Sequence, residues 1–256
     1  MAQFPDFVRI VEVGARDGLQ NEAAVSTQDK VALINALADA GLKDIEAGAF
    51  VSPKWVPQMA DSSDVISALN LPNVNLSALT PNLRGAEAAK QVGIQEFAIF
   101  TAASEAFCQK NINCSIDESI DRFKDVMDFA KANNIRVRGY VSCVMGCPYQ
   151  GDVDYNDVLK VSQRLLELGC YEISLGDTIG VGTAKKVDEL LDLLLQHIDK
   201  SKLAVHFHDT YGQALTNIYT ALSRGIATVD SAVAGLGGCP YAKGASGNVA
   251  TEDVVY

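Results

Sequence analysis

Short runs of β-branched and aromatic residues alternate with longer amphipathic stretches along the chain. The short runs have the length of buried strands, whereas the longer ones place apolar residues three and four positions apart, as a helix with one buried face requires. The predicted strands are residues 8–13, 44–49, 74–79, 96–100, 136–142, 172–175, 203–207 and 228–233. The predicted helices are residues 27–40, 62–69, 83–91, 116–132, 153–168, 184–198 and 214–223.

Several predicted helices carry recognisable start and stop residues. Ser26 or Thr27 can cap the first helix, and Ser115 can cap the fourth, because their hydroxyl oxygens accept hydrogen bonds from free amides of the first turn. Gly169 and Gly225 follow the fifth and seventh helices, where a left-handed residue often ends a helix. These signals support the predicted alternation of strands and helices.

Eight strand units joined by helices favour a closed parallel (β/α)8 barrel, a TIM barrel of the α/β class. An open doubly wound sheet is the alternative that the alternation leaves open. Only residues 235–256 follow the eighth strand, so we expect the eighth outer helix and the C-terminal extension to be truncated. Either the chain is shortened or a partner covers the bottom of the barrel. No linker or change of composition divides residues 1–256, which we interpret as one domain.

Composition and charge exclude several classes of function. The chain has 256 residues, of which 48% are hydrophobic, and its formal net charge is -11. An acidic protein is poorly suited to a phosphate backbone, so we expect no nucleic-acid partner. No apolar run approaches the length of a membrane span, which argues against a membrane partner.

The cysteines and the first residues favour a cytoplasmic location. Residues 1–8 contain Pro5 and Asp6 and lack the basic and apolar regions of a secretory signal. The six cysteines show no Cys-x-x-Cys spacing, and we interpret most of them as reduced packing residues. They are Cys108, Cys114, Cys143, Cys147, Cys170 and Cys239.

Polar residues gather where the predicted strands end. In a parallel barrel these ends and the loops after them share one rim, so we expect their side chains to converge on one site. In chain order these residues are Glu12, Arg16, Asp17, Gln20, Glu46, Arg138, Tyr140, Ser174, Asp177, His206, His208, Cys239 and Asn248.

His206 and His208 are the most informative pair. Side chains two apart on a strand project to the same side, so the two imidazoles can share one metal ion. Two unrelated histidines at a strand end are the simpler explanation. His197 is placed near the end of a helix, and we assign it no chemistry.

Simpler explanations also exist for other polar residues. Arg16 and Asp17 can form an ordinary ion pair, and Asp177 can merely cap a turn. Glu46 lies between Ile45 and Ala47 and would be costly to bury without a partner or a cation.

A glycine-rich loop surrounds Cys239 after the last strand. The segment 234–248 contains five glycines, which permit backbone shapes that suit a phosphate cradle or a mobile lid. It lacks the lysine of a phosphate-binding loop. We favour a lid that carries Cys239, which can serve as an acid if its thiol stays protonated.

Four segments resemble 3-hydroxy-3-methylglutaryl-CoA (HMG-CoA) lyases. They are residues 11–22, residues 174–182, the His-Phe-His-Asp sequence at 206–209, and the Gly-Leu-Gly-Gly-Cys-Pro-Tyr loop at 235–241. The resemblance covers nearly the whole chain. It implies a (β/α)8 metallolyase domain related to pyruvate carboxyltransferases. The family usually continues for several tens of residues past Tyr256, in a segment that helps to hold coenzyme A.

The resemblance implies a divalent metal with the ligands Asp17, His206, His208 and Asn248. Oxygen and imidazole donors suit Mg²⁺ or Mn²⁺, although Co²⁺ and Zn²⁺ stay possible. The metal would chelate the C3 hydroxyl of HMG-CoA, and the products would be acetyl-CoA and acetoacetate.

The resemblance also implies roles for individual side chains. Arg16 would stabilise the oxyanion on the thioester carbonyl. Asp177, Glu46 or, with less support, His206 would take the hydroxyl proton, and Cys239 would protonate the enolate carbon. Substrate contacts would come from Arg16, Asn111, Tyr140 and Ser174, while Glu12 and Gln20 would orient Arg16 and Asp17.

Two other functions stay open. A Claisen-type synthase of the same superfamily, similar to isopropylmalate or homocitrate synthase, would share the Arg-Asp and His-x-His motifs but not the cysteine loop. A non-catalytic barrel is the third possibility. As partners the resemblance implies an acyl-CoA substrate and a homodimer.

Overall fold

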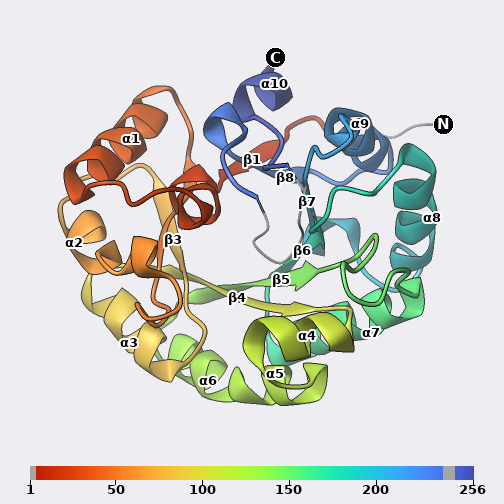
Figure 1. Cartoon of the computed structure of the whole chain (residues 1–256), viewed down its shortest axis with the longest axis horizontal. Coiled ribbons are helices and arrows are strands. Elements are labelled where there is room, and N and C mark those ends of the chain that lie inside the picture. Colours follow the sequence, from red (N-terminus) through yellow and green to blue (C-terminus); the bar gives the residue numbers. More distant parts are fainter. Residues whose placement is uncertain (1–3, 239–245) are drawn as a thin grey trace.

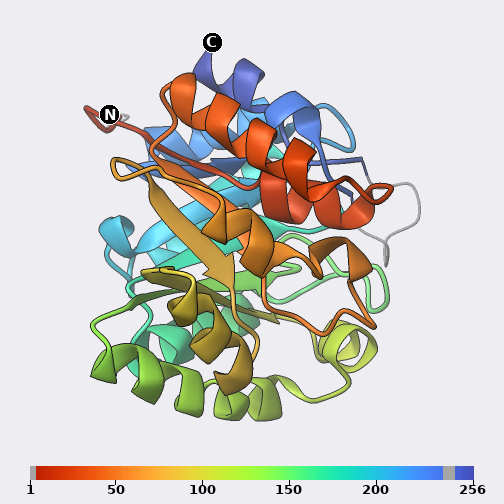
Figure 2. The ribbon, with the colours of Figure 1, turned by 90° about the vertical axis from the view of Figure 1, so that its left-hand side faces the viewer.

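The computed structural model describes residues 4–238 and 246–256. Within these residues, eight parallel strands pair in chain order and close into a barrel, with the first strand hydrogen-bonded to the last. Figure 1 looks along this barrel and shows the helices in a ring around it, and Figure 2 shows it from the side. The predicted TIM barrel is confirmed. An open sheet is excluded by the pairing of the first and eighth strands.

The strands lie close to the predicted ranges. They are β1 Arg9–Glu12, β2 Asp44–Ala49, β3 Asn75–Leu79, β4 Glu96–Ala102, β5 Arg136–Ser142, β6 Glu172–Asp177, β7 Leu203–Phe207 and β8 Thr228–Ser231.

The helices pack their apolar faces on the outside of the strands. They are α1 Thr27–Asp39, α2 Ser62–Ser67, α3 Leu83–Gln91, α4 Glu105–Ile112, α5 Ile116–Arg122, α6 Lys124–Ala132, α7 Tyr155–Leu168, α8 Ala184–Leu194, α9 Ala214–Ser223 and α10 Thr251–Val255. The helix after β8, α10, has five residues. No helix of the described residues is both long and apolar enough to cross a bilayer.

The helix predictions differ from the structure in three places. The predicted helix 184–198 ends at Leu194, so His197 lies in the turn after α8 rather than in the helix. The predicted helix 116–132 is divided into α5 and α6 at Phe123, whose amide bonds the carbonyl of Ile120 three residues back instead of four. This tighter turn interrupts the regular α-helical bonding. The short helix α4 was not predicted. It begins after Ser104, whose hydroxyl accepts a hydrogen bond from the amide of Phe107.

The predicted capping residues function as expected. The hydroxyl of Ser26 accepts a bond from the amide of Asp29 at the start of α1. Ser115 and Glu118 form a reciprocal capping box at the start of α5. Gly169 ends α7 in the left-handed region, at φ 117°.

The interior of the barrel is polar, although such barrels are more often filled by branched apolar side chains. Arg138 in β5 donates to Glu172 in β6 at 2.7 Å and, across the barrel, to Asp230 in β8 at 2.7 Å. Arg9 in β1 pairs with Glu172 at 2.5 Å and with Asp44 at 3.3 Å. The apolar core lies instead between the strands and the helices. The interior charges therefore compensate one another inside the ring of strands.

We expect Arg138→Met to destabilise the fold strongly, because it leaves Glu172 and Asp230 buried without their shared cation. Breaking a buried pair in this way costs about 3–5 kcal/mol. Chemical denaturation followed by circular dichroism measures the loss.

The control is Arg164→Met, which breaks the exposed pair between Arg164 and Asp117. Such a pair contributes about 0–1 kcal/mol. Equal losses in the two variants would show that the interior pair is no more important for stability than a surface one.

Candidate metal centre and active site

A cavity of about 540 Å³ lies at the carboxyl ends of the strands. Its wall includes Arg16 and Asp17 from the segment after β1, Tyr140 from β5, and the histidines His206 and His208 from β7 and the residue after it. These residues are far apart in the chain. The predicted convergence of polar residues on one rim is therefore observed for this group.

A π-helical turn over Gly14–Gly18 places Arg16 and Asp17 at the cavity. The turn is anchored by Glu12, whose carboxylate accepts bonds from the amides of Gly14 at 2.8 Å and Val233 at 2.9 Å and from the hydroxyl of Thr251 at 2.6 Å. A Cβ on Gly14 would lie 2.6 Å from this carboxylate, so a larger residue would have to displace the carboxylate from these bonds. Glu12 thus holds the backbone of the turn to the segments after β8.

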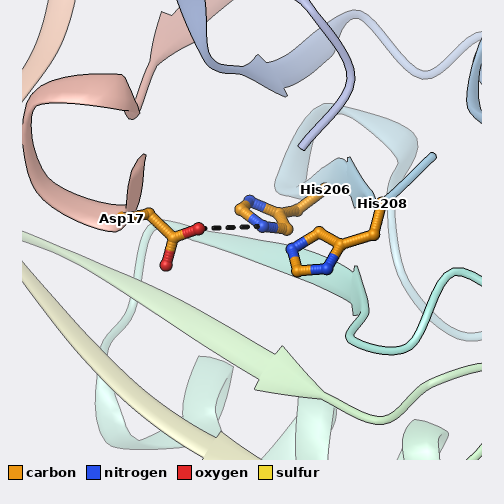
Figure 3. A group of neighbouring side chains, drawn as sticks. All are labelled: Asp17, His206 and His208. Carbon is orange, nitrogen blue, oxygen red and sulfur yellow. Dashed lines mark ion pairs between the residues drawn. The ribbon is translucent and has the colours of Figure 1, made fainter. Parts of the chain in front are cut away.

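Asp17, His206 and His208 bring their ligand atoms within 4.8 Å of one another. Figure 3 shows the three side chains pointing toward one another, with Nε2 of His206 facing the Asp17 carboxylate at 3.8 Å. The two histidines therefore project to the same side, as the alternation of the strand predicted.

Asn248 is hydrogen-bonded to this group. Residue 248 is held beside His208 by an antiparallel β-bridge. Its Nδ2 donates to Oδ2 of Asp17 at 2.9 Å and to the carbonyl of Leu236 at 3.0 Å. Its Oδ1 is buried and has no hydrogen-bond partner. An amide oxygen without a donor has the chemistry of a ligand for a hard cation.

The donor set fits a divalent cation. Burial, together with the neighbouring His206, lowers the pKa of His208 to about 4, so its imidazole is neutral near pH 7, as a metal ligand must be. Burial raises the pKa of Asp17, but the charge of Arg16 outweighs this effect, and the pKa is lowered. One carboxylate and two imidazoles thus lie within reach of one point of the cavity wall, and the amide group of Asn248 bonds the same carboxylate from behind.

Arg16 is buried but still reaches the cavity. It bonds Glu46 through Nε at 2.7 Å and NH2 at 2.6 Å, and Asp17 through NH1 at 2.7 Å. The ion pair between Arg16 and Asp17 considered from the sequence therefore exists, but within the site rather than on the surface. These contacts use three of the five N–H donors of a guanidinium, which leaves two for a substrate oxygen.

Glu46 and Gln20 support this pair. Glu46 is fully buried, and its Oε2 accepts from Arg16 and from the hydroxyl of Tyr140 at 3.3 Å, while Oε1 has no partner. Burial raises the pKa of Glu46 against the opposing charge of Arg16. Gln20 donates to Oδ1 of Asp17 at 2.9 Å. Glu46 thus has the partner that its burial required.

Glu46, Asp177, Ser174 and Asn248 are not among the residues that line the cavity. The carboxylate of Asp177 accepts bonds from the amides of Val181 at 3.1 Å and Gly182 at 2.7 Å, which is the turn-capping role considered as its simpler explanation. Ser174 lies inside the barrel and donates to Asp230 at 2.7 Å. Asn111 and Tyr140, in contrast, both line the cavity.

Cys239 lies outside the described residues. The residue before it, Gly238, lines the cavity, and its carbonyl accepts a bond from Nδ2 of Asn21 at 2.9 Å.

Sequence reasoning did not single out Asp230. This buried carboxylate in β8 contacts Arg138, Ser174 and Nδ1 of His206. Burial raises its pKa, but the charge of Arg138 outweighs this and holds the pKa well below its usual range. The sequence did contain a signal for it. Asp230 lies in a strand predicted to be buried, where a carboxylate needs a partner, and the same argument drew attention to Glu46.

Comparisons with known proteins agree with this geometry. The family model described as HMGL-like matches residues 7–256. The 3-hydroxy-3-isohexenylglutaryl-CoA/hydroxymethylglutaryl-CoA lyase of Pseudomonas aeruginosa is 58% identical over 98% of this chain and 85% of its own length. The chain belongs to the HMG-CoA lyase family. The mitochondrial hydroxymethylglutaryl-CoA lyase of Homo sapiens is 56% identical over 100% of this chain and 79% of its own length.

Solved structures of the family share the fold closely. A hydroxymethylglutaryl-CoA lyase from Pseudomonas aeruginosa superimposes with a TM-score of 0.96 over 99% of this chain and 85% of that one. An HMG-CoA lyase from Acinetobacter baumannii, in complex with coenzyme A and 3-methylmalate, is 35% identical, with a TM-score of 0.93 over 100% of this chain and 84% of that one. The carboxyltransferase domain of a Rhizobium etli pyruvate carboxylase, at 17% identity and a TM-score of 0.71, shares the fold alone.

We expect His208→Ala to weaken the binding of Mn²⁺ by more than about 100-fold, because loss of a direct ligand should exceed the 10–100-fold effect of an outer contact. Electron paramagnetic resonance of free Mn²⁺ measures the affinity without substrate. His197→Ala is the matched control, since His197 is exposed and remote from the cavity wall. Equal affinities in the two variants would remove His208 from the ligand set.

Proposed function

We propose that this chain cleaves HMG-CoA to acetyl-CoA and acetoacetate by a metal-dependent reverse Claisen reaction. The observation that carries the proposal is the group of Asp17, His206, His208 and Asn248 beside Arg16, in a chain of the HMG-CoA lyase family. The C2–C3 bond breaks as the C3 hydroxyl loses its proton and becomes a ketone. The electron pair passes to C2 as an enolate, which is then protonated.

These four residues would hold the divalent ion, for which Mg²⁺ or Mn²⁺ suits the oxygen and imidazole donors. When bound, the ion would polarise the C3 hydroxyl and lower its pKa. Arg16 binds the thioester carbonyl and stabilises the oxyanion that develops there, since its charge is permanent and two of its N–H donors are free.

Among the candidate bases, Glu46 has the best support. One of its carboxylate oxygens has no hydrogen-bond partner, and burial raises its pKa against the charge of Arg16. Both oxygens of Asp177 are occupied by backbone amides, and Nδ1 of His206 is occupied by Asp230. In this proposal Glu46 takes the hydroxyl proton from behind the cavity wall, where it contacts the wall residues Arg16 and Tyr140, while Asp177 serves as the cap of its turn.

Asn111 and Tyr140 contact the substrate, since both line the cavity. Ser174 lies behind the cavity wall and acts on the site indirectly, through its hydrogen bond to Asp230. Gln20 orients Asp17 directly, and Glu12 orients the turn that carries Arg16 and Asp17. Cys239 supplies the proton to the enolate carbon, a role supported by its place in the cysteine loop.

The partner is an acyl-CoA, which agrees with the coenzyme A in the structure of the Acinetobacter baumannii lyase. The Pseudomonas aeruginosa relative is named for two substrates, so the isohexenyl homologue belongs in the same assay. We further propose a homodimer in the cytoplasm. Relatives include a cytoplasmic lyase of Mus musculus and a mitochondrial one of Gallus gallus.

The direct test is incubation of the purified chain with HMG-CoA and Mg²⁺ or Mn²⁺, with acetoacetate as the product measured. Arg16→Gln should lower kcat by about 10²–10³, as expected for loss of one oxyanion donor. The control is Arg84→Gln, at an exposed position of α3. Near-normal turnover of Arg16→Gln would contradict the oxyanion role. Product formed equally well after exhaustive chelation would contradict the metal.

Replacement of the Cys239 thiol tests separately which group protonates the enolate carbon. Cys239→Ser should lower kcat by about 10²–10⁴, the usual contribution of a general acid, because a serine hydroxyl is a much weaker one. Its affinity for Mn²⁺ and its circular dichroism spectrum should match those of the parent chain. Unchanged turnover would assign the protonation to another group.

A further inference from the structure

Asp230 lies directly behind the proposed metal centre and takes no part in the reaction steps above. It belongs to β8, where it is the register partner of His206 in β7. Its side chain is buried inside the barrel, and its Oδ2 lies 3.3 Å from Nδ1 of His206. The other ring nitrogen, Nε2, faces Asp17. The imidazole therefore stands between a carboxylate on each side, one of which is a proposed metal ligand.

The Asp230 carboxylate is held rigidly by other bonds. NH2 of Arg138 donates to Oδ1 at 2.7 Å and NH1 to Oδ2 at 3.1 Å, a two-point contact that fixes the plane of the carboxylate. The hydroxyl of Ser174 donates to Oδ2 at 2.7 Å. Arg138 is itself held by Glu172 at 2.7 Å and by the hydroxyl of Tyr140 at 3.0 Å. Neither oxygen of Asp230 can turn away from its partners without breaking one of these bonds.

A carboxylate can only accept a hydrogen bond, so it selects one form of the neutral imidazole. Opposite Oδ2 of Asp230, the ring proton belongs on Nδ1. Nε2 then carries a lone pair on the side of Asp17, where the divalent ion would bind. Such outer carboxylates orient metal-bound histidines and increase their basicity.

We propose that Asp230 is the positioning residue of the metal centre and holds His206 with its proton on Nδ1 and its Nε2 lone pair toward the cation. The inference rests on the metal site within the proposed function. Arg138 and Ser174 act through Asp230, because they fix the carboxylate that fixes the ring. Residues inside the barrel, near the middle of the strands, thus support the proposed metal site at its rim.

The test is Asp230→Asn in the whole chain, read first without metal. The protein contains only three histidines, so the ring nitrogens are assignable by long-range ¹H–¹⁵N correlation spectra of ¹⁵N-histidine protein. Burial lowers the pKa of His206, but the bond to Asp230 and the charge of Asp17 outweigh this effect and raise it. The spectra are therefore recorded at alkaline pH, where the ring is neutral, and the parent should show the Nδ1–H form of His206. In the variant, the amide oxygen stays with Arg138, and its NH2 group faces the ring. This arrangement should move the proton to Nε2 and lower the affinity for Mn²⁺ by about 10–100-fold.

Glu96→Gln is the matched control. It makes the same acid-to-amide change in a buried carboxylate that bonds Asn75 at 2.9 Å and Tyr171 at 3.0 Å and, among the described residues, has no bond to Arg138, Asp230 or His206. It should lower thermal stability while leaving the His206 proton on Nδ1 and the affinity for Mn²⁺ unchanged. If it altered both as strongly as Asp230→Asn, Asp230 would be a merely structural member of the network and the inference would be wrong.

If Asp230→Asn does not fold, Ser174→Ala is the variant that tests the same inference. It removes one bond to Oδ2 without a change of charge, and the affinity for Mn²⁺ should fall by up to about tenfold, the effect of one hydrogen bond. An unchanged Nδ1–H form and unchanged affinity in every folded variant at Asp230 and Ser174 would overturn the inference. A parent chain that shows the expected ring proton and metal affinities but does not cleave HMG-CoA would refute the proposed function alone.

Discussion

The buried contact between Arg138 and the two carboxylates Asp230 and Glu172 is the constraint on which the rest of the structure depends. Three charged groups inside a barrel are tolerable only because each lies within hydrogen-bond distance of an opposite charge. Their contacts join β5 to β6 and, across the interior, to β8. The same atoms that compensate one another electrostatically therefore hold distant strands together and place a fixed acceptor behind His206.

The candidate metal centre also depends on closure of the barrel. Asp17 follows β1, the histidines end β7, and Asn248 follows β8, so the group forms only when the first and last strands pair. Glu12 strengthens this junction, because its carboxylate bonds the turn after β1 and two segments that follow β8. Asn248 adds a direct bond to Asp17. The contacts that stabilise the junction of β1 and β8 therefore also determine the geometry of the candidate cation site.

Several features were predictable because their cause is local. Alternation along one strand was enough to put His206 and His208 on the same side, and a run of eight strand units was enough to favour a closed barrel. Other features escaped because their cause is contact with distant residues. The pairing of Glu46 with Arg16 requires β2 to lie beside the turn after β1. Its place at a strand end made Asp177 a candidate base, and the structure adds that its carboxylate accepts amides of the turn that follows β6.

By itself, the sequence determined the order of strands and helices, the caps of α1, α5 and α7, and the residues that gather at the rim, since these follow from periodicity and from hydrogen bonds within a few residues. Only the tertiary structure decided which of the rim residues face the cavity, and that the interior behind them is a compensated network of charges. The physical reason is that burial and charge pairing depend on which strands meet across the barrel, whereas a linear pattern records only which residues are neighbours along the chain.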